Sequence, residues 1–369
     1  MICSVIIPYY NRMEHITNAL KTLNQQDFDA DDFEVILAED GSHDFNQEAI
    51  DGMNLKIAVR YFNTMKNIGR AYARNLGILH AKGELLVFLD SDMLVKPDYV
   101  SQHVNFHQRV FPDQMVLQIG LRNLLYNKPY NNLTNRLTKL AFEEDYDHEE
   151  RHGLFQLISE NLGSLRSNWL YTYTNNMSIP KKAVELFGGF DENFKGWGLE
   201  DTEFGYRQNK NGVRIMYNPN IEAFHQYHSE QFTKDKAVEW EKNLKYFIGK
   251  YKDDFPVNLL RMLPESDLKY QDMFSMPEDV CREETQKIHI NYEKTLRMVY
   301  DLSERKFAKT LMVKDPTIQM LSDLVAANSN TRYNIMCSRN DLDLIIWIQN
   351  YITNSQVLLY TYAPRSFEH

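Results

Sequence analysis

The sequence predicts an α/β fold with a mostly parallel central sheet and a small C-terminal α/β appendage. Short apolar segments alternate with segments of helical periodicity from residue 2 onward, which is typical of parallel strands joined by crossover helices. The composition changes toward the C-terminal third. At 369 residues the chain exceeds the usual size of one core, so we expect one large domain over residues 1–255 and an appendage over 273–369.

The N-terminal part accounts for the parallel sheet. We expect helices after Asn11 and over 70–81, and strands over 2–7, 33–38, 57–62 and 85–89. The last of these strands is apolar throughout, as in a strand buried on both faces. It delivers Asp90-Ser91-Asp92 to its carboxyl end.

The rest of the chain has a weaker pattern. An acidic stretch over 143–152 is interpreted as a loop. Further elements are helices over 180–187, from about 200 to 212 and over 235–252, and a strand over 213–217 that a turn at 218–220 follows. In the appendage we expect a helical stretch from 273, strands over 333–337 and 357–362, and a helix over 342–352.

Composition excludes several classes of protein. The net charge is −10 and no Lys/Arg-rich run occurs, so nucleic acid is not an expected partner. The three cysteines are too far apart for a disulfide framework or a zinc cluster. With no apolar run of about 20 residues and no basic leader, we expect no integral membrane segment and a cytoplasmic location. Peripheral membrane attachment and homo-oligomerisation stay open.

Asp90 and Asp92 are the first candidates for chemistry. Open α/β sheets bind ligands at the carboxyl ends of their strands, and a hard divalent cation prefers carboxylate oxygens. Such a cation can bridge the carboxylates to a diphosphate and neutralise the charge of a leaving group. The alternative is a polar turn that ends a strand, which is the usual meaning of an isolated Asp-x-Asp.

Three further segments give this pair a context: Pro8-Tyr9-Tyr10-Asn11-Arg12, Glu39-Asp40-Gly41-Ser42 and Ala73-Arg74-Asn75-Leu76-Gly77-Ile78. With them, residues 2–250 resemble the family 2 inverting glycosyltransferases, whose fold is named GT-A. The resemblance implies a UDP-sugar donor. It places the uracil on Asp40 and the nucleoside above Pro8, Tyr10, Asn11 and Arg12. Arg70 or Arg74 then faces the nucleotide, Asp92 holds the metal, Asp90 reaches ribose or metal, and Ser91 lies between them.

A second cluster, Gly196-Trp197-Gly198-Leu199-Glu200-Asp201, follows Gly188-Gly189-Phe190-Asp191-Glu192. Glycines let a sugar approach the backbone, and an indole offers a flat apolar face for its ring. The alternative is a core tryptophan and an acidic first helical turn. The cluster resembles the acceptor-side signature of β1,4-galactosyltransferases and chondroitin-type polymerases. This implies that Trp197, Gly198 and Glu200 bind the acceptor and that Asp201 is the general base, whereas Glu203 is expected to be structural.

The third element is His225-Gln226-Tyr227-His228. Chondroitin-type polymerases carry a similar His-Gln, so the resemblance implies that His225 joins Asp90 and Asp92 at the metal. For His228 a surface or core role is equally acceptable. A nitrogen ligand beside carboxylate and phosphate oxygens favours Mn²⁺, with Mg²⁺ as the alternative.

Together these features predict a metal-dependent inverting transferase that moves a hexose or N-acetylhexosamine from a UDP-sugar to an acceptor hydroxyl. The acceptor is a glycan, a peptide side chain or a small molecule. Two rivals stay open: a catalytically silent scaffold that binds carbohydrate or nucleotide on the same fold, and a nucleotidyltransferase. The second does not explain the cluster around Trp197.

Overall fold

The computed structural model describes residues 1–110, 114–125, 146–149, 160–164, 168–228, 234–254, 309–314, 317–327, 331–338 and 357–362, and the single positions 151, 152, 155, 257 and 260. The chain forms two compact units. The first comprises residues 1–149 and 170–247, and the second comprises 150–169 and 248–369. The expected boundary between 255 and 273 falls in a stretch that lies mostly outside the described residues. All candidate site residues belong to the first unit.

One nine-stranded sheet organises the first unit, with the strand order β3-β2-β1-β4-β8-β6-β9-β5 and β7 paired to β6. The mixed α/β architecture confirms the predicted fold class. Its first half is parallel, since β1 pairs with both β2 and β4 and β2 pairs with β3. These strands are β1 (Cys3–Tyr9), β2 (Phe33–Glu39), β3 (Ala58–Asn63) and β4 (Leu85–Leu89). All four lie where the apolar segments predict them.

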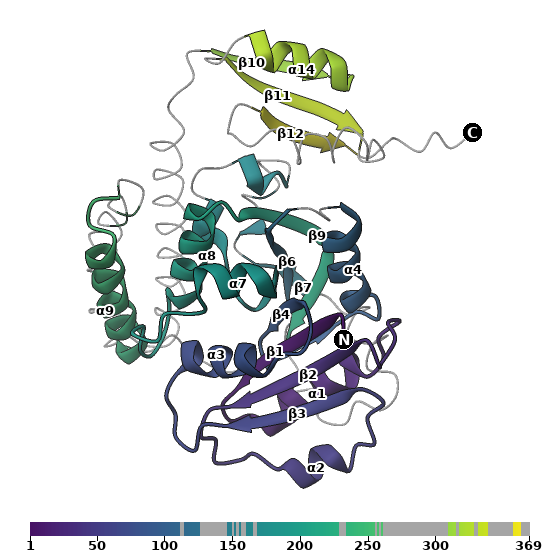
Figure 1. The fold of residues 1–369 in the computed structure, drawn as a ribbon, viewed down its shortest axis with the longest axis vertical. Coiled ribbons are helices and arrows are strands. Elements are labelled where there is room, and N and C mark those ends of the chain that lie inside the picture. Colours follow the sequence, from purple (N-terminus) through teal and green to yellow (C-terminus); the bar gives the residue numbers. More distant parts are fainter. Residues whose placement is uncertain are drawn as a thin grey trace. The chain divides into compact units, whose positions relative to one another are not determined.

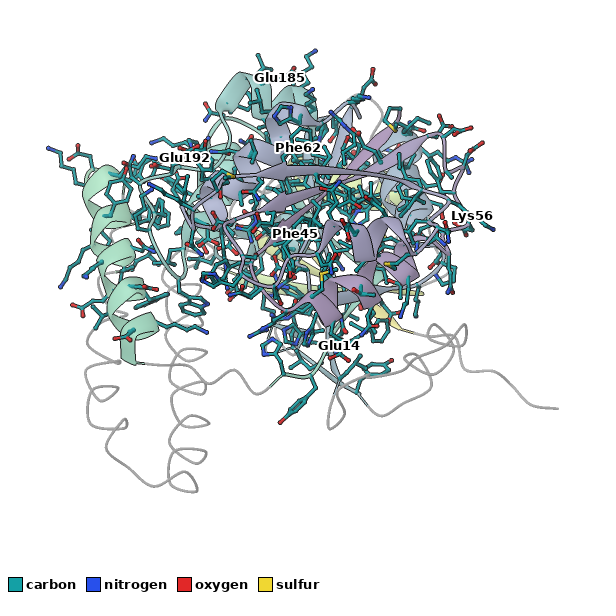
Figure 2. The ribbon with its side chains drawn as sticks, turned by 90° about the horizontal axis from the view of Figure 1, so that it is seen from below. Glu14, Phe45, Lys56, Phe62, Glu185 and Glu192 are labelled. Carbon is teal, nitrogen blue, oxygen red and sulfur yellow. The ribbon has the colours of Figure 1, made fainter. Side chains whose placement is uncertain are left out.

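Helices cover both faces of this parallel half. Successive side chains of β1 alternate between the faces, and those on each face are buried under a helix. Val5 and Ile7 pack in one core with the apolar stripe of α1 (Met13–Leu23). Ile6 faces the other way and touches Gly77 of α3 (Arg70–His80), where a Cβ would lie 2.3 Å from the Ile6 side chain. Figure 1 shows the two helices on either side of the sheet. In Figure 2, Glu14 of α1 and Glu185 of α7 (Lys181–Phe187) likewise lie on opposite sides.

The second half of the sheet contains antiparallel pairs that the sequence pattern does not predict. These join β4 to β8 (Asn176–Pro180), β8 to β6 (Val116–Leu125), β6 to β7 (Tyr146–His148) and β5 (Met93–Val95) to β9 (Arg214–His225). β7 lies within the stretch 143–152 that was interpreted as a loop. β6 also pairs with β9 in parallel. This half carries the histidines of the candidate site.

The prediction that a turn at residues 218–220 ends the strand is wrong. β9 does not end at Tyr217 but continues to His225, because the pairing steps from Asn218–Gly120 to Glu222–Leu121 and leaves 219–221 as a bulge. Proline is accepted in strands at such bulges, and the Asn218 side chain accepts a hydrogen bond from the Asn220 amide there. The sequence Asn-Pro-Asn therefore marks an irregularity within a strand.

The remaining helices of the first unit agree with the sequence pattern or add to it. They are α2 (Gln47–Asp51), α4 (Tyr99–Asn105), α8 (Glu200–Lys210) and α9 (Lys234–Lys250). The described part of the second unit holds a parallel sheet of β10 (Lys309–Lys314), β11 (Thr331–Ser338) and β12 (Val357–Tyr362), and α14 (Ile318–Ala327). The helices expected from 273 and over 342–352 lie outside the described residues. No helix in the described ranges combines the length and the hydropathy needed to span a bilayer.

Candidate functional site

The chain leaves β1 through two consecutive left-handed residues, Asn11 and Arg12, with φ of 59° and 68°. Hydrogen bonds hold this unusual turn: the Asn11 amide donates to Ser42 Oγ at 2.9 Å, and the His43 amide donates to Asn11 Oδ1 at 3.0 Å. Tyr10 beside the turn is 46% exposed. The turns that follow β1 and β2 thus form one surface at the carboxyl edge of the sheet, as the sequence predicts.

Asp40 is nearly enclosed by the loop over residues 64–69. Its carboxylate accepts hydrogen bonds from the Ile68 amide at 2.8 Å, the Gly69 amide at 2.9 Å and the Thr64 hydroxyl at 3.2 Å. Gly41 allows the loop this close, since a Cβ there would lie 2.5 Å from the Lys66 and Asn67 backbone. A carboxylate offers about four lone-pair positions, so these bonds leave about one for a ligand donor.

Arg74 is buried and links the two candidate clusters. Nη1 donates to Glu200 Oε1 at 3.0 Å, and Nη2 donates to Asp90 Oδ1 at 3.3 Å. Its neighbour Asn75 exchanges hydrogen bonds of 2.8 Å with the Phe190 backbone. Arg70, the other basic candidate, is exposed at the start of α3. Arg74 therefore holds one carboxylate from each candidate cluster in a single ion-pair network.

Asp92 points away from this network toward two histidines. Its Oδ2 lies 3.4 Å from His225 Nε2 and 3.3 Å from His228 Nε2, and the two Nε2 atoms are 3.2 Å apart. Burial favours a higher pKa for Asp92, but the charges and hydrogen bonds of the two histidines outweigh it and hold this pKa well below its usual value. Arg12 adds a longer ion pair at 3.7 Å.

This trio fits a transition metal. Ligand atoms about 2.1 Å from one ion are roughly 3.0 to 3.4 Å apart, which matches the separations among the two nitrogens and Oδ2. The other oxygen, Asp92 Oδ1, is buried and has no hydrogen-bond partner among the described residues. Within the described ranges, Asp92, His225 and His228 are the one group of three His, Cys, Asp or Glu side chains whose ligand atoms lie close enough together to hold an ion. Asp90, also expected at the metal, contacts Arg74.

The backbone over residues 195–199 is shaped by glycines and held by α9. Gly196 and Gly198 have φ of 72° and 94°, and added Cβ atoms would meet the Glu239 carboxylate at 2.3 Å and the Trp240 ring at 2.7 Å. Glu239 accepts from the Trp197 amide at 2.9 Å. Asn243 donates to the carbonyls of Lys195, Trp197 and Gly198. The loop is thus fixed before Glu200 starts α8.

Asp201 differs from its neighbour in its electrostatic surroundings. Burial, with a contribution from the Glu200 charge, raises the pKa of Asp201 to about 7. Glu200 is paired with Arg74, whereas Asp201 Oδ1 accepts a 2.8 Å hydrogen bond from the Thr202 amide. Glu203 is fully buried and pairs with Arg207 at 3.1 Å. A carboxylate with a pKa near neutrality is suited to take a proton from an attacking hydroxyl.

Sequence reasoning left the role of His228 open and missed several other residues that shape this site. His228 joins Asp92 and His225, and the spacing of three between the histidines is the sequence signal for it. Glu239 and Asn243, one helical turn apart on α9, carry no local signal because their partners lie more than 40 residues away. Gln226 and Asn18 form a 3.0 Å hydrogen bond next to the histidines across 208 residues of sequence.

The comparisons with known protein families give two adjacent matches. Residues 4–166 match the family described as glycosyl transferase family 2, and residues 165–230 match the N-terminal domain of galactosyltransferase. Residues 4–166 therefore resemble the family 2 glycosyltransferases. The two matched segments meet at residues 165–166, so the first covers the nucleotide-side candidates and the second covers Trp197, Glu200, Asp201 and the histidines. Sugar transfer is the activity that both descriptions share.

The curated relatives include an uncharacterized glycosyltransferase and two enzymes with named activities. The chain is 28% identical over 283 residues to the uncharacterized glycosyltransferase YfnE of Bacillus subtilis, covering 68% of this chain and 71% of that one. It is 32% identical over 222 residues to validoxylamine A glucosyltransferase of Streptomyces hygroscopicus subsp. jinggangensis, covering 57% and 52%. Chondroitin synthase of Escherichia coli is 28% identical over 255 residues, covering 64% and 36%. The chain thus spans about half or less of the latter two proteins.

A solved structure supports the fold. Residues 1–349 of S. aureus TarS, in complex with UDP-GlcNAc, match with a TM-score of 0.52 and 17% identity, over 82% of each chain. At this identity the likeness establishes the GT-A architecture alone.

Proposed function

We propose that this chain is a metal-dependent inverting glycosyltransferase that moves a hexose or N-acetylhexosamine from a UDP-sugar to an acceptor hydroxyl. The observation that carries the proposal is the position of Arg74 between Asp90 and Glu200. Direct displacement requires donor and acceptor to meet, and one guanidinium holds a carboxylate from each side within hydrogen-bond distance.

On the donor side, Asp92, His225 and His228 would hold the metal ion, and its charge would stabilise the departing diphosphate. Two imidazole nitrogens and one carboxylate favour Mn²⁺ over Mg²⁺. The acceptor capacity that Asp40 keeps beside the Ile68 and Gly69 amides suits the N–H of a uracil, which supports UDP as the nucleotide. The turn at Asn11 and Arg12 brings backbone close to the same edge.

On the acceptor side, Asp201 takes the proton of the attacking hydroxyl. Its pKa of about 7 leaves it basic enough to accept a proton and ionised in a large fraction of molecules at neutral pH. Glu200, neutralised by Arg74, is suited to accept hydrogen bonds from other hydroxyls of the acceptor. Trp197, fixed by Glu239 and Asn243, supplies the platform for its ring.

The substrates are proposed at the level of class. One relative is named for glucose transfer to validoxylamine A and another for chondroitin synthesis, so both small molecules and glycans occur as acceptors or products among the relatives. A glycan, a small molecule and a peptide side chain are the acceptor classes to test. A cytoplasmic location and self-association stay predictions.

A UDP-release screen tests the proposal. The protein is incubated with UDP-glucose, UDP-galactose, UDP-N-acetylglucosamine or UDP-N-acetylgalactosamine, with Mn²⁺ and a panel of acceptors. We expect UDP release with one sugar class and a β-linked product from the α-linked donor, because one displacement inverts the anomeric carbon. An α-linked product would exclude single displacement, and pyrophosphate release from a nucleoside triphosphate and a sugar phosphate would indicate nucleotidyl transfer.

A further inference from the structure

Gln226 lies between the two histidines of the candidate metal site, and its side chain points into the protein. It is 2% exposed. Its Oε1 accepts a hydrogen bond from Asn18 Nδ2 at 3.0 Å, and its Nε2 donates to the His15 carbonyl at 3.0 Å. Both partners belong to α1, more than 200 residues earlier in the chain.

The backbone of Gln226 makes a third connection. Its amide donates to the Asp92 carbonyl at 2.9 Å and so extends the β5–β9 pairing by one step beyond Met93–His225. One residue therefore ties three segments together: the start of β5 with Asp92 before it, the end of β9 with His225, and α1. A buried amide with both ends of its side chain bonded has a fixed orientation, and its two chain neighbours share that restraint.

We propose that Gln226 is a positioning residue of the metal site, which locks the segment 225–228 onto α1 so that His225 and His228 face Asp92. The proposal rests on the proposed function, since it concerns the same site. Without the side-chain bonds, the pairing with β5 still holds His225, but the chain beyond it keeps only the longer contacts of His15 with Tyr227 and His228 as its link to α1. His228 is then the ligand whose position suffers most.

His15 supports this arrangement. Its ring lies edge-on to His228 with 5.9 Å between centroids, and its Nε2 is 3.5 Å from the Tyr227 carbonyl. The first turn of α1 thus contacts the histidine segment at Gln226, Tyr227 and His228. Residues that orient metal ligands in this way typically change metal affinity about 10- to 100-fold when they are replaced.

The full chain offers a matched set of variants. Gln226→Met keeps the length of the side chain and removes both hydrogen bonds, and Asn18→Leu removes one of them from the side of α1. Asn243→Leu is the control, because Asn243 is also a buried amide that clamps a loop of the site, at Lys195, Trp197 and Gly198. Binding of Mn²⁺ alone is measured by the electron paramagnetic resonance of the free ion, and thermal unfolding is followed in parallel.

We expect Gln226→Met to weaken Mn²⁺ binding about tenfold or more and Asn18→Leu to weaken it by a smaller factor. Asn243→Leu should lower the melting temperature about as much as Gln226→Met does, while its affinity for Mn²⁺ stays within about twofold of wild type. Folded Gln226→Met that binds Mn²⁺ like wild type overturns the positioning role alone. If Gln226→Met does not fold, unchanged affinity in Asn18→Leu overturns it. Wild-type protein that binds no Mn²⁺ instead rejects the metal in the proposed function, and the positioning role with it.

Discussion

The guanidinium of Arg74 lies 3.0 Å from the Glu200 carboxylate, and both side chains are almost fully buried. The pair crosses 126 residues of sequence and joins α3 to the start of α8. A buried ion pair of this kind costs much when one partner is removed and little when both are replaced.

Arg74→Met should therefore destabilise the fold by about 3 to 5 kcal/mol, because Glu200 is left as an uncompensated buried charge. The double variant Arg74→Met/Glu200→Gln should recover much of this loss. Urea unfolding of the single and double variants measures both effects. If the double variant loses as much stability as the two single variants together, the pair is not coupled.

Asp201→Asn should reduce turnover by about 10² to 10⁴, because the amide keeps the size of the side chain and removes the basic oxygen. Binding of UDP with Mn²⁺ should not change. Glu200→Gln should act in part on acceptor affinity and raise the acceptor KM. The assignment is reversed if Asp201→Asn keeps near wild-type turnover while Glu200→Gln is inactive at saturating acceptor.

The pH profile provides a separate test of the same residue. With a pKa of about 7, Asp201 is protonated in acid, so kcat/KM for the acceptor should rise through about pH 7 and level off above it. Folding should follow the opposite trend. Because the pKa is raised above that of the unfolded chain, stability falls as the pH rises from about 4 to 7. Asp201→Asn should thus gain melting temperature relative to wild type at pH 8 and show no such gain at pH 3.

His225→Gln and His228→Gln should weaken Mn²⁺-dependent UDP binding to a similar degree, since both Nε2 atoms lie at nearly the same distance from Asp92. Calorimetry of UDP with and without Mn²⁺ measures this. A His228→Gln protein with wild-type Mn²⁺ dependence would remove His228 from the ligand set and leave His225 with Asp92.

Gly198→Ala should destabilise the protein more than Gly212→Ala. Both glycines have φ near 90°, so both variants incur backbone strain of about 1 to 2 kcal/mol. Gly198 carries an additional cost, because its Cβ would lie 2.7 Å from Trp240, whereas nothing lies within 4 Å at Gly212. Urea unfolding isolates this cost as the difference between the variants. Equal losses would mean that the Trp240 ring moves aside without penalty.

The sequence is most informative where burial follows a simple pattern. The strand over 85–89 is apolar at every position, so its central place could be predicted. β6 and β8 could not, because their core positions include the polar residues Gln118 and Ser178, which bond to the buried His103. Polar residues satisfied by distant partners look like surface residues in a sequence.

The same limit applies to the site. Asp90 and Asp92 can be recognised in the sequence because a strand end and a known motif coincide there. The sequence does not show that their two side chains point in different directions. Asp90 turns to Arg74, and Asp92 turns to the histidines. Local sequence does not encode which of two neighbouring carboxylates meets a partner that is 16 or 136 residues away in the chain.

The bulge at residues 219–221 determines where this protein tolerates changes in length. Side chains of a strand alternate between faces, so a shift of one residue sends each to the opposite side. A gain at Pro219 or Asn220 can be absorbed by this bulge, with Glu222 still opposite Leu121, whereas Ile221 is buried and its carbonyl accepts a hydrogen bond from Asn176. A deletion between Glu222 and His225 has no such reserve, and with Glu222 held opposite Leu121 it would place Gln226 at the position of His225. We therefore expect insertions to be tolerated at the exposed Asn220 and not between Glu222 and His225.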